Sequence, residues 1–374
     1  MPSCGCSLSS SLSRTCSSGR RRPRRNRRSC PSISQSVPTL ELLDDGVRII
    51  DQTRLPGSLA LVELRRLEDF CAAIATMQVR GAPLIGITAA FGAAFALRAG
   101  PGLEEAVARL KATRPTAVNL AWALERVAAA VRDSDNPAAA ALAEARAIAA
   151  EDVAACRAIG EHGLVLLQTL ATGTRPLQVL THCNAGRLAT LAWGTATAPI
   201  YLALERGLDV HVWVSETRPR NQGASLTAWE LAEAGVPFTL VADNACGALM
   251  QSGEVDCVMV GSDRTAANGD VCNKVGTYPK ALLAREHGVP FYVLLPTSTV
   301  DAACARGDDI PIEQRDAAEV LTAPVGGESL TVPGAAAWNP AFDITPAALV
   351  TSLVTERGCV AASTEGVQSL GLQP

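Results

Sequence analysis

The chain has 374 residues, more than one hydrophobic core usually spans, since single cores rarely grow beyond ~250 residues; two domains are expected. The net charge is −4, and because the first 35 residues are rich in arginine and contain no acid, the rest of the chain is more acidic still, which argues against nucleic-acid binding. No apolar run free of charges and turn formers reaches the ~18 residues of a membrane span, so no membrane association is expected.

Cysteine and histidine usage indicates neither a metal site nor a disulfide framework. The twelve cysteines are scattered, and outside the first 35 residues none forms a CxxC pair. Only four histidines are present, and they form no cluster with the cysteines. We expect no metal, no cofactor, and a reducing cytoplasmic location.

Residues 1–35 are rich in serine and arginine and carry almost no apolar side chains, so they cannot bury a core and are expected to be disordered. This composition suits an organellar transit peptide, and the RRRPRRNRR run suits a basic tail. A misplaced start codon explains both features, and the Ala-rich body, typical of high-GC bacterial genes, favours it.

From residue 36 to 172 the pattern is helical, because apolar residues recur at three- and four-residue spacing. A short β-like segment at 47–56 comes before the helices. The helices are expected at 67–77, 85–97, 103–111, 117–132 and 137–170. An α-rich N-terminal domain is predicted.

From residue 173 to 362 short β-branched runs alternate with helical ones, which is typical of a parallel α/β sheet. The strands are expected at 177–183, 209–216, 237–243, 256–263 and 291–296, with helices from Arg187, near Leu226, after 243, and around 278–287. This predicts a Rossmann-like catalytic domain, followed by a tail at 363–374.

Polar residues follow four of these strands, at 181–186, 215–223, 243–244 and 261–264. Ligands of such sheets bind beyond the carboxyl ends of the strands, so these clusters are expected to share one rim. The turn 184–186 could present backbone N–H groups to an anion, or it could be only a turn before a helix.

Cys183 and Asp263 are the two reactive side chains at this rim. Cys183 could be a ligand-facing thiol or a small hydrophobe at a strand end. Asp263 could be a partly desolvated acid or base, or a capping residue paired with Arg264.

Three basic residues suit an anionic ligand. Arg80 and Arg114 each come just before a helix start, where a cation opposes the helix dipole, so a bound anion would explain them. Lys274 lies in the polar, glycine-containing segment 267–277, where it could bind phosphate or simply be solvated.

Nine stretches in order resemble the methylthioribose-1-phosphate isomerase family, which is related to the regulatory subunits of the eukaryotic translation-initiation exchange factor and to ribose-1,5-bisphosphate isomerases. They are VRGAPLIGITAAFG, RPTAVNLAWAL, THCNAGRLATLAWGTA, VSETRPRNQGASLTAWEL, DNACGALM, VGSDRTAANGDVCNKVGTY, PTSTVD, IPIEQRDAAEV and WNPAFDITPAALVTSLVTERG. The similarity covers roughly residues 38–362. Cys183 in THCNAG and Asp263 in GSDR, together with RGA and NGDVxNKxGT, favour the isomerases over the regulatory subunits.

The resemblance implies conversion of the aldose 5-methylthioribose 1-phosphate to the ketose 5-methylthioribulose 1-phosphate in methionine salvage. It implies that Asp263 donates a proton and that Cys183 stabilises the transition state. The substrate would be held by Arg80, Gly81, Ala82, Arg114, Gln222, Asn273 and Lys274. Two mild departures from the family pattern are Ser262 and Cys272, where alanine is commoner.

The resemblance also implies a homodimer, with residues 338–342 close to the active site or the subunit interface. Two alternatives stay open: an isomerase for another 1-phosphopentose, such as 5-deoxyribose 1-phosphate or ribose 1,5-bisphosphate, or a non-catalytic regulatory subunit that senses sugar phosphates. A dinucleotide-dependent oxidoreductase is disfavoured because no GxGxxG follows the first strand.

Overall fold

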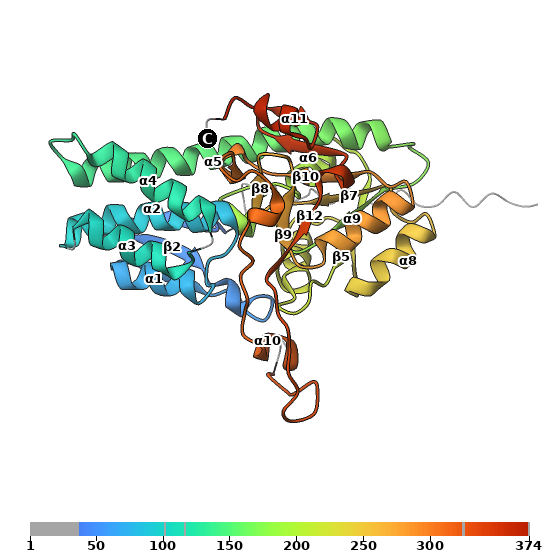
Figure 1. Cartoon of the computed structure of the whole chain (residues 1–374), viewed down its shortest axis with the longest axis horizontal. Helices are drawn as coiled ribbons and strands as arrows, with labels where there is room; N and C mark the ends of the chain where they lie inside the picture. Colours follow the sequence, from blue (N-terminus) through green and yellow to red (C-terminus); the bar gives the residue numbers. More distant parts are fainter. Residues whose placement is uncertain (1–36, 101, 116, 324–325, 373–374) are drawn as a thin grey trace, which may run out of the picture. The chain divides into compact units, whose positions relative to one another are not determined.

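The computed structural model describes residues 37–100, 102–115, 117–323 and 326–372. The predicted disordered extension, residues 1–35, lies outside the described residues. Figure 1 shows the helices of the first half (blue to cyan) beside the strands and helices of the second half (yellow to red). The expected α/β class, a helical part followed by a Rossmann-like part, is confirmed.

The first half begins with a three-stranded antiparallel sheet and continues into helices. The strands are β1 (Leu40–Leu42), β2 (Val47–Ile50) and β3 (Leu61–Leu64), and the helices are α1 (Leu67–Ala75), α2 (Ala82–Ala99), α3 (Leu103–Thr113), α4 (Val118–Val131) and α5 (Pro137–Leu170). Helix α2 is the central one: it packs against α1, α3, α4 and α5, and most of its side chains are buried. The helices agree with the sequence prediction to within a few residues at each end.

Helix α5 connects the two halves, running along the top of the view in Figure 1. Asn136 caps its start by accepting a hydrogen bond from the Ala139 N–H, and Pro137 occupies the first turn, where a missing N–H costs nothing. Ala141 and Ile148 belong to the core of the helical half, whereas Ile159 and Leu167 belong to the core on one face of the large sheet. The predicted boundary at 172/173 therefore follows a helix that contributes to both cores.

The second half is built on a seven-stranded sheet with the order β14-β13-β10-β7-β4-β5-β6, in which all neighbours are parallel except β13 and β14. Its strands are β4 (Leu177–Thr181), β5 (Val210–Ser215), β6 (Phe238–Val241), β7 (Cys257–Val260), β10 (Phe291–Leu294), β13 (Ser352–Thr355) and β14 (Gly358–Val360). Chain order reverses between β4 and β7, the position at which sheets of this type bind ligands.

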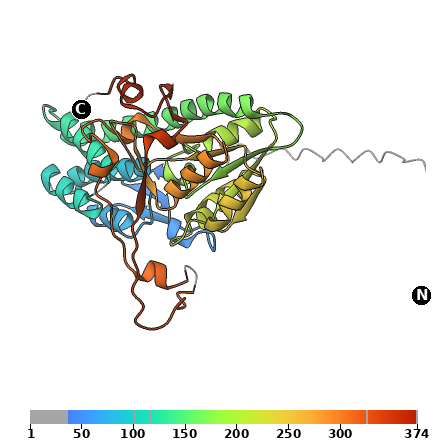
Figure 2. The same cartoon turned by 45° about the vertical axis from the view of Figure 1, so that its right-hand side comes forward.

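Helices cover both faces of this sheet. The helices are α6 (Ala198–Glu205), α7 (Ala228–Glu233), α8 (Cys246–Gln251), α9 (Thr277–Glu286) and the C-terminal α11 (Thr364–Gln368). One core contains residues of α5, α6 and α7, and the core of the opposite face contains residues of α8, α9 and α11. Figure 2 turns the yellow and orange helices of this half toward the viewer.

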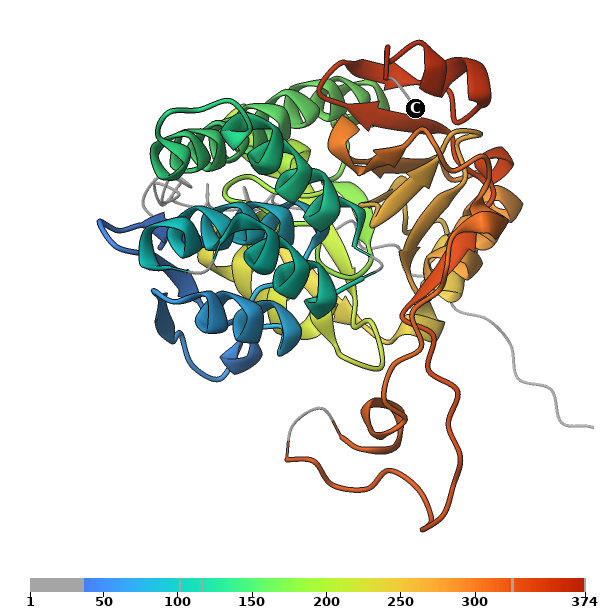
Figure 3. The same ribbon diagram turned by 60° about the vertical axis from the view of Figure 1, so that its left-hand side comes forward.

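A second, four-stranded sheet of order β11-β8-β9-β12 completes this half, with strands β8 (Arg264–Ala266), β9 (Val271–Lys274), β11 (Val300–Asp301) and β12 (Phe342–Thr345). Between β11 and β12 the chain makes a long excursion, which carries the short helix α10 (Ala318–Leu321) and extends away from both sheets (Figures 1 and 3). The exposed apolar side chains Leu330, Val332 and Trp338 lie on it.

The five predicted strands of the parallel sheet are confirmed, but other predictions in this half were wrong. The helix expected from Arg187 is only a 3-10 turn (Arg187–Ala189), and α6 begins at Ala198. Trp193 and Gly194 have positive φ, which breaks the helix, and Pro199 restarts it. The segment 267–277, expected as a polar loop, is a loop only in part: residues 267–270 turn between β8 and β9, whereas Val271–Lys274 form β9, which pairs on both sides.

Candidate active site

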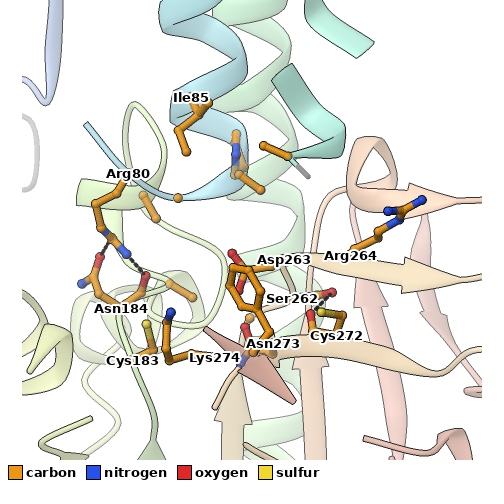
Figure 4. Close-up of a pocket in the computed structure, with 18 of the residues that line it drawn as sticks. Arg80, Ile85, Cys183, Asn184, Ser262, Asp263, Arg264, Cys272, Asn273 and Lys274 are labelled. Carbon is orange, nitrogen blue, oxygen red and sulfur yellow. Dashed lines mark hydrogen bonds between the residues drawn. The ribbon is translucent and has the colours of Figure 1, made fainter. Parts of the chain in front are cut away.

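All nine predicted site residues line one pocket beyond the carboxyl ends of β4 and β7. The sheet half contributes Cys183, Gln222, Asp263, Asn273 and Lys274, and the helical half contributes Arg80, Gly81, Ala82 and Arg114. Figure 4 shows Asp263, Lys274 and Cys183 on neighbouring walls, with Arg80 above Asn184. Further polar wall residues are His182, Asn184 and Ser262, and apolar ones include Met77, Ile85, Pro296, Ile310 and Phe342.

The sheet topology explains why Cys183 and Asp263 meet, although 80 residues separate them in sequence. Cys183 follows β4 and Asp263 follows β7, and these neighbouring parallel strands end at the same edge. Cys183 has a φ of +62°, a conformation that costs a non-glycine residue energy and is common at functional sites. Its N–H donates to Thr217 Oγ1 at 2.8 Å, and its carbonyl accepts from Thr227 Oγ1 at 2.6 Å, which holds the strained turn in place.

Asp263 is fixed by its backbone, whose N–H donates to the Cys272 carbonyl at 2.9 Å. Burial raises the pKa of its carboxyl, against the opposing effects of Lys274, Arg114 and Arg80. Within the described part of the chain no side chain hydrogen-bonds to this carboxyl, and Arg264 pairs instead with Asp301, its Nε donating at 2.9 Å. The alternative of an Asp263–Arg264 pair was therefore wrong, and the carboxyl is available to a ligand.

Burial also raises the pKa of the Cys183 thiol, although Lys274 and Arg80 act in the opposite direction. The thiol is therefore neutral near neutral pH and can donate a weak hydrogen bond. The reading of Cys183 as a small hydrophobe alone does not account for its position at the pocket wall beside two cations.

Arg80 and Lys274 are buried cations without a direct carboxylate partner among the described residues. The Arg80 guanidinium donates to the Asn184 carbonyl at 2.7 Å, to the Asn184 side-chain oxygen, and to Gln52 Oε1 at 3.0 Å. Lys274 Nζ donates to the Ala341 carbonyl at 2.8 Å and lies 4.6 Å from the centre of the Phe342 ring. Burial lowers the pKa of both groups, and a bound anion would offset that cost. The solvated-lysine alternative for Lys274 was wrong.

Arg114 enters the pocket from the end of α3 and is backed by a carboxylate. Its Nη2 lies 3.0 Å from Glu313 Oε2, whereas its Nε is buried and has no partner in the described part of the chain. Arg315 binds the other oxygen of Glu313 at 2.8 Å and also pairs with Glu319, which in turn pairs with Arg220. This alternating array connects Arg114 to the loop that carries Gln222.

The remaining predicted residues complete the wall. Gly81 has a φ of +96°, and a Cβ there would lie 2.6 Å from Ala189, so only glycine fits this approach of the two halves. The Gln222 Oε1 atom is buried without a partner among the described residues, which leaves it for a ligand hydroxyl. Asn273 is buried, with Nδ2 donating to Thr277 Oγ1 at 3.0 Å.

Comparison with known proteins identifies the family. Residues 78–362 match the model of the initiation factor 2 subunit family. A methylthioribose-1-phosphate isomerase from Methylorubrum populi is 58% identical, covering 87% of this chain and 93% of the relative, and one from Methylocella silvestris is 55% identical, covering 86% and 92%. The chain belongs to this family of isomerases.

Two solved structures of the wider family are also similar. The 5-methylthioribose 1-phosphate isomerase from Pyrococcus horikoshii has a TM-score of 0.82 and 39% identity, covering 92% of this chain and 98% of that one. The translation initiation factor eIF-2B delta subunit from A. fulgidus has a TM-score of 0.75 and 40% identity, covering 87% and 96%. The isomerase fold thus extends over nearly the whole described chain.

Several residues of this isomerase site were missed from the sequence. His182 lies on the pocket wall, with Nε2 2.9 Å from the Val275 carbonyl and Nδ1 3.2 Å from Ser215 Oγ, and burial lowers its pKa to about 3. Gln52 and Glu313 contact the arginines from distant parts of the chain. His182 could have been predicted, since it is next to Cys183 in the sequence. No sequence pattern predicts the contacts of Gln52 and Glu313 with the arginines.

The segment 338–342, expected near the active site or subunit interface, contributes Phe342 to the pocket wall, whereas Trp338 is 81% exposed on the excursion. Across the described residues there is no group of three or more histidine, cysteine or acidic side chains arranged to hold a metal ion. The helices of the described part of the chain include none long and apolar enough to cross a membrane.

Proposed function

We propose that this protein converts 5-methylthio-α-D-ribose 1-phosphate to 5-methylthio-D-ribulose 1-phosphate, the isomerisation of methionine salvage. The observation that carries the proposal is the meeting of Asp263 and Cys183 at the reversal point of the sheet, in one pocket with Arg80, Arg114 and Lys274. The relatives named methylthioribose-1-phosphate isomerase support it over nearly the full chain.

The substrate carries phosphate on its anomeric carbon, so its ring cannot open spontaneously to a free aldehyde. Arg80, Arg114 and Lys274 bind the phosphate, and the binding energy of this remote group orients the sugar. Gly81, Ala82, Gln222 and Asn273 complete the contacts by backbone N–H groups or amide side chains. This assignment is supported by two buried cations without a carboxylate partner in the described residues and by the unsatisfied Nε of Arg114.

Asp263 opens the ring. Its carboxylic acid donates a proton to the ring oxygen as the bond from that oxygen to carbon 1 breaks, which leaves positive charge on carbon 1 and a carboxylate on Asp263. Lys274, Arg114 and Arg80 stabilise that carboxylate, since each lowers the pKa of Asp263. Burial raises the pKa of this carboxyl, which favours the protonated form before the step.

The hydrogen on carbon 2 then moves to carbon 1 as a hydride, and the carbon-2 hydroxyl loses its proton to become the ketone; that proton restores the Asp263 acid. Direct transfer is favoured over an enediolate because the Asp263 carboxylate takes the hydroxyl proton and His182, the pocket's histidine, is a poor second base: both its nitrogens are engaged, and burial lowers its pKa to about 3. Cys183 stabilises the transition state through its neutral thiol. Carbon-2 deuterium retained on carbon 1 of the product supports the hydride path, and loss to water rules it out.

Turnover assays with three sugars test the function: methylthioribose 1-phosphate, 5-deoxyribose 1-phosphate and ribose 1,5-bisphosphate. We expect the highest kcat/KM with the first, and a preference for either of the others would reassign the substrate. A regulatory subunit is the second candidate, favoured by the 40% identity to the eIF-2B delta subunit structure. Absence of turnover with all three sugars would support it. We further propose a cytoplasmic homodimer.

A further inference from the structure

Glu230 is a buried carboxylate that none of these steps uses. It lies on α7 with an exposure of 0%. Its Oε1 accepts from Asn184 Nδ2 at 3.0 Å, and its Oε2 accepts from the Leu188 N–H at 3.3 Å. Both carboxylate oxygens therefore hold the loop that follows β4, directly behind the pocket.

Asn184 connects this carboxylate to Arg80. Its Nδ2 donates to Glu230 and, at 3.0 Å, to Thr227 Oγ1, while its side-chain oxygen accepts from Arg80 (Figure 4). An amide has one donor end and one acceptor end, so the partners of Nδ2 decide which end faces the guanidinium. A carboxylate only accepts, and Glu230 thus fixes the amide oxygen of Asn184 toward Arg80.

Gly186 makes room for this arrangement. A Cβ at residue 186 would lie 1.4 Å from Glu230 Oε1, so no other residue can stand there while the carboxylate keeps its place. The φ of Gly186 is −98°, which any residue adopts. Glycine is therefore required at residue 186 because Glu230 occupies the space of a side chain, not because of the backbone conformation.

Three titratable side chains lie around Glu230: Arg187 of the 3-10 turn, Arg80 before α2 and Tyr201 of α6. Arg187 and Arg80 lower the pKa of Glu230. Burial raises the pKa of Tyr201, and Glu230 raises it further. Burial outweighs these effects and raises the pKa of Glu230 to about 7. Protonation converts one of its two accepting oxygens to a donor, which weakens its hold on either Asn184 or Leu188.

We propose that Glu230 is a positioning residue for Arg80, acting through Asn184, and that Gly186 is required to leave room for its carboxylate. The inference rests on the proposed function of the pocket, in which Arg80 binds the substrate phosphate. Arg80 binds the phosphate in the ground state and the transition state alike, and it is only one of three cations near Asp263, so the loss of Glu230 acts on KM more than on kcat.

Glu230→Gln tests this at constant volume. Glutamine offers one acceptor and one donor, so either Asn184 Nδ2 or the Leu188 N–H loses its acceptor at residue 230, and Asn184 Nδ2 would keep only Thr227 Oγ1. We expect KM to rise roughly tenfold with kcat little changed, the scale of a lost charge-assisted hydrogen bond. The ratio of the variant KM to the parent KM should shrink as pH falls from about 8 to about 6, because the parent then also loses an acceptor. Substrate ionisation cancels in this ratio.

Asp152→Asn is the matched control. Asp152 is also buried, burial raises its pKa to about 7, and it accepts from the Leu191 N–H at 2.9 Å in the same loop, but its hydrogen bonds do not involve Arg80 or Asn184. It should keep the parent KM at every pH. Gly186→Ala should raise KM as Glu230→Gln does, and the double variant should be no worse than the worse single one, since both act on one contact.

A Glu230→Gln variant with the parent KM across this pH range, or an Asp152→Asn variant with an equal KM rise, would overturn the proposal. If Glu230→Gln does not fold, the KM of Gly186→Ala decides in its place. Calorimetric titration with inorganic phosphate separates this inference from the proposed function. Absence of turnover by the parent protein would refute the proposed function only. Equal phosphate dissociation constants for the parent and Glu230→Gln would refute the positioning role.

Discussion

Replacing Asp263 with asparagine removes the transferable proton and keeps the volume of the side chain. In the ground state burial raises the pKa of the carboxyl and so favours its neutral form, to which the amide is similar in polarity, and KM should change little. In the transition state the parent gains a carboxylate that faces Lys274, Arg114 and Arg80, and asparagine cannot form it. We therefore expect kcat to fall by at least ~10²-fold, within the 10²–10⁴ range of general acids, or about 2.7 kcal/mol or more at 1.36 kcal/mol per tenfold.

The assay is steady-state turnover of methylthioribose 1-phosphate, with the melting temperature as the control for folding. The Asp263 carboxyl accepts no hydrogen bond from the described residues, so the variant loses no partner and its stability should change by less than ~1 kcal/mol. Parent kcat should fall as pH rises through the pKa of this acid, and the variant should lack that limb. A folded variant with near-parent kcat would refute the acid role and move the search to another residue of the pocket.

Four further outcomes are expected. Arg114→Ala should raise KM roughly tenfold or more, since a charge-assisted contact contributes about 1.5–3 kcal/mol, and an unchanged KM would remove Arg114 from the phosphate site. A chelator such as EDTA should leave activity intact; loss that a divalent ion restores would contradict the metal-free proposal. Light scattering at micromolar concentration should give a dimer, and a monomer would count against it. The free energy of unfolding should fall as pH rises from about 4 to about 7, because burial raises the folded-state pKa of Asp152 to about 7. The contribution of Asp152 to stability is complete below its unfolded-state pKa and is lost as pH rises through its folded-state pKa. Asp152→Asn should flatten this slope in urea titrations.

The sequence predicted the elements whose signal is local. Helices α1 to α5 follow from apolar spacing, and the strands of the parallel sheet follow from short β-branched runs between turn formers. Cys183 and Asp263 could be placed at one rim because carboxyl ends of parallel strands share an edge. Strands β8, β9 and β12 were missed. β9 pairs with β12, about 70 residues further along the chain, which leaves no periodic trace, and β8 and β9 form a hairpin too short to show a period.

The same limit applies to the surroundings of the site residues. Arg80 was predicted as a ligand residue, but its contacts with Gln52 and Asn184 bring together residues 28 and 104 positions away. Glu230 stands in SLTAWEL, which reads as an ordinary amphipathic helix. Its burial and its fit against Gly186 exist only once α7 packs behind the β4 turn. The sequence thus predicted side chains that line the pocket but not the side chains that orient them.

Neither half of the chain contains a complete site. The helical half supplies Arg80 and Arg114, and the sheet half supplies Asp263, Cys183 and Lys274. The halves are joined at the pocket by Arg80–Asn184 and Arg114–Glu313, and away from it by Asn119 Nδ2, which donates to Ser298 Oγ at 3.1 Å. Because α5 contributes to both cores, its packing joins the helical half, which carries the arginines that we propose bind the phosphate, to the sheet half, which carries the proposed acid. The proposed ring opening needs Asp263 held at a fixed place relative to the bound phosphate, so we infer that the long continuous helix serves the proposed chemistry as well as the fold.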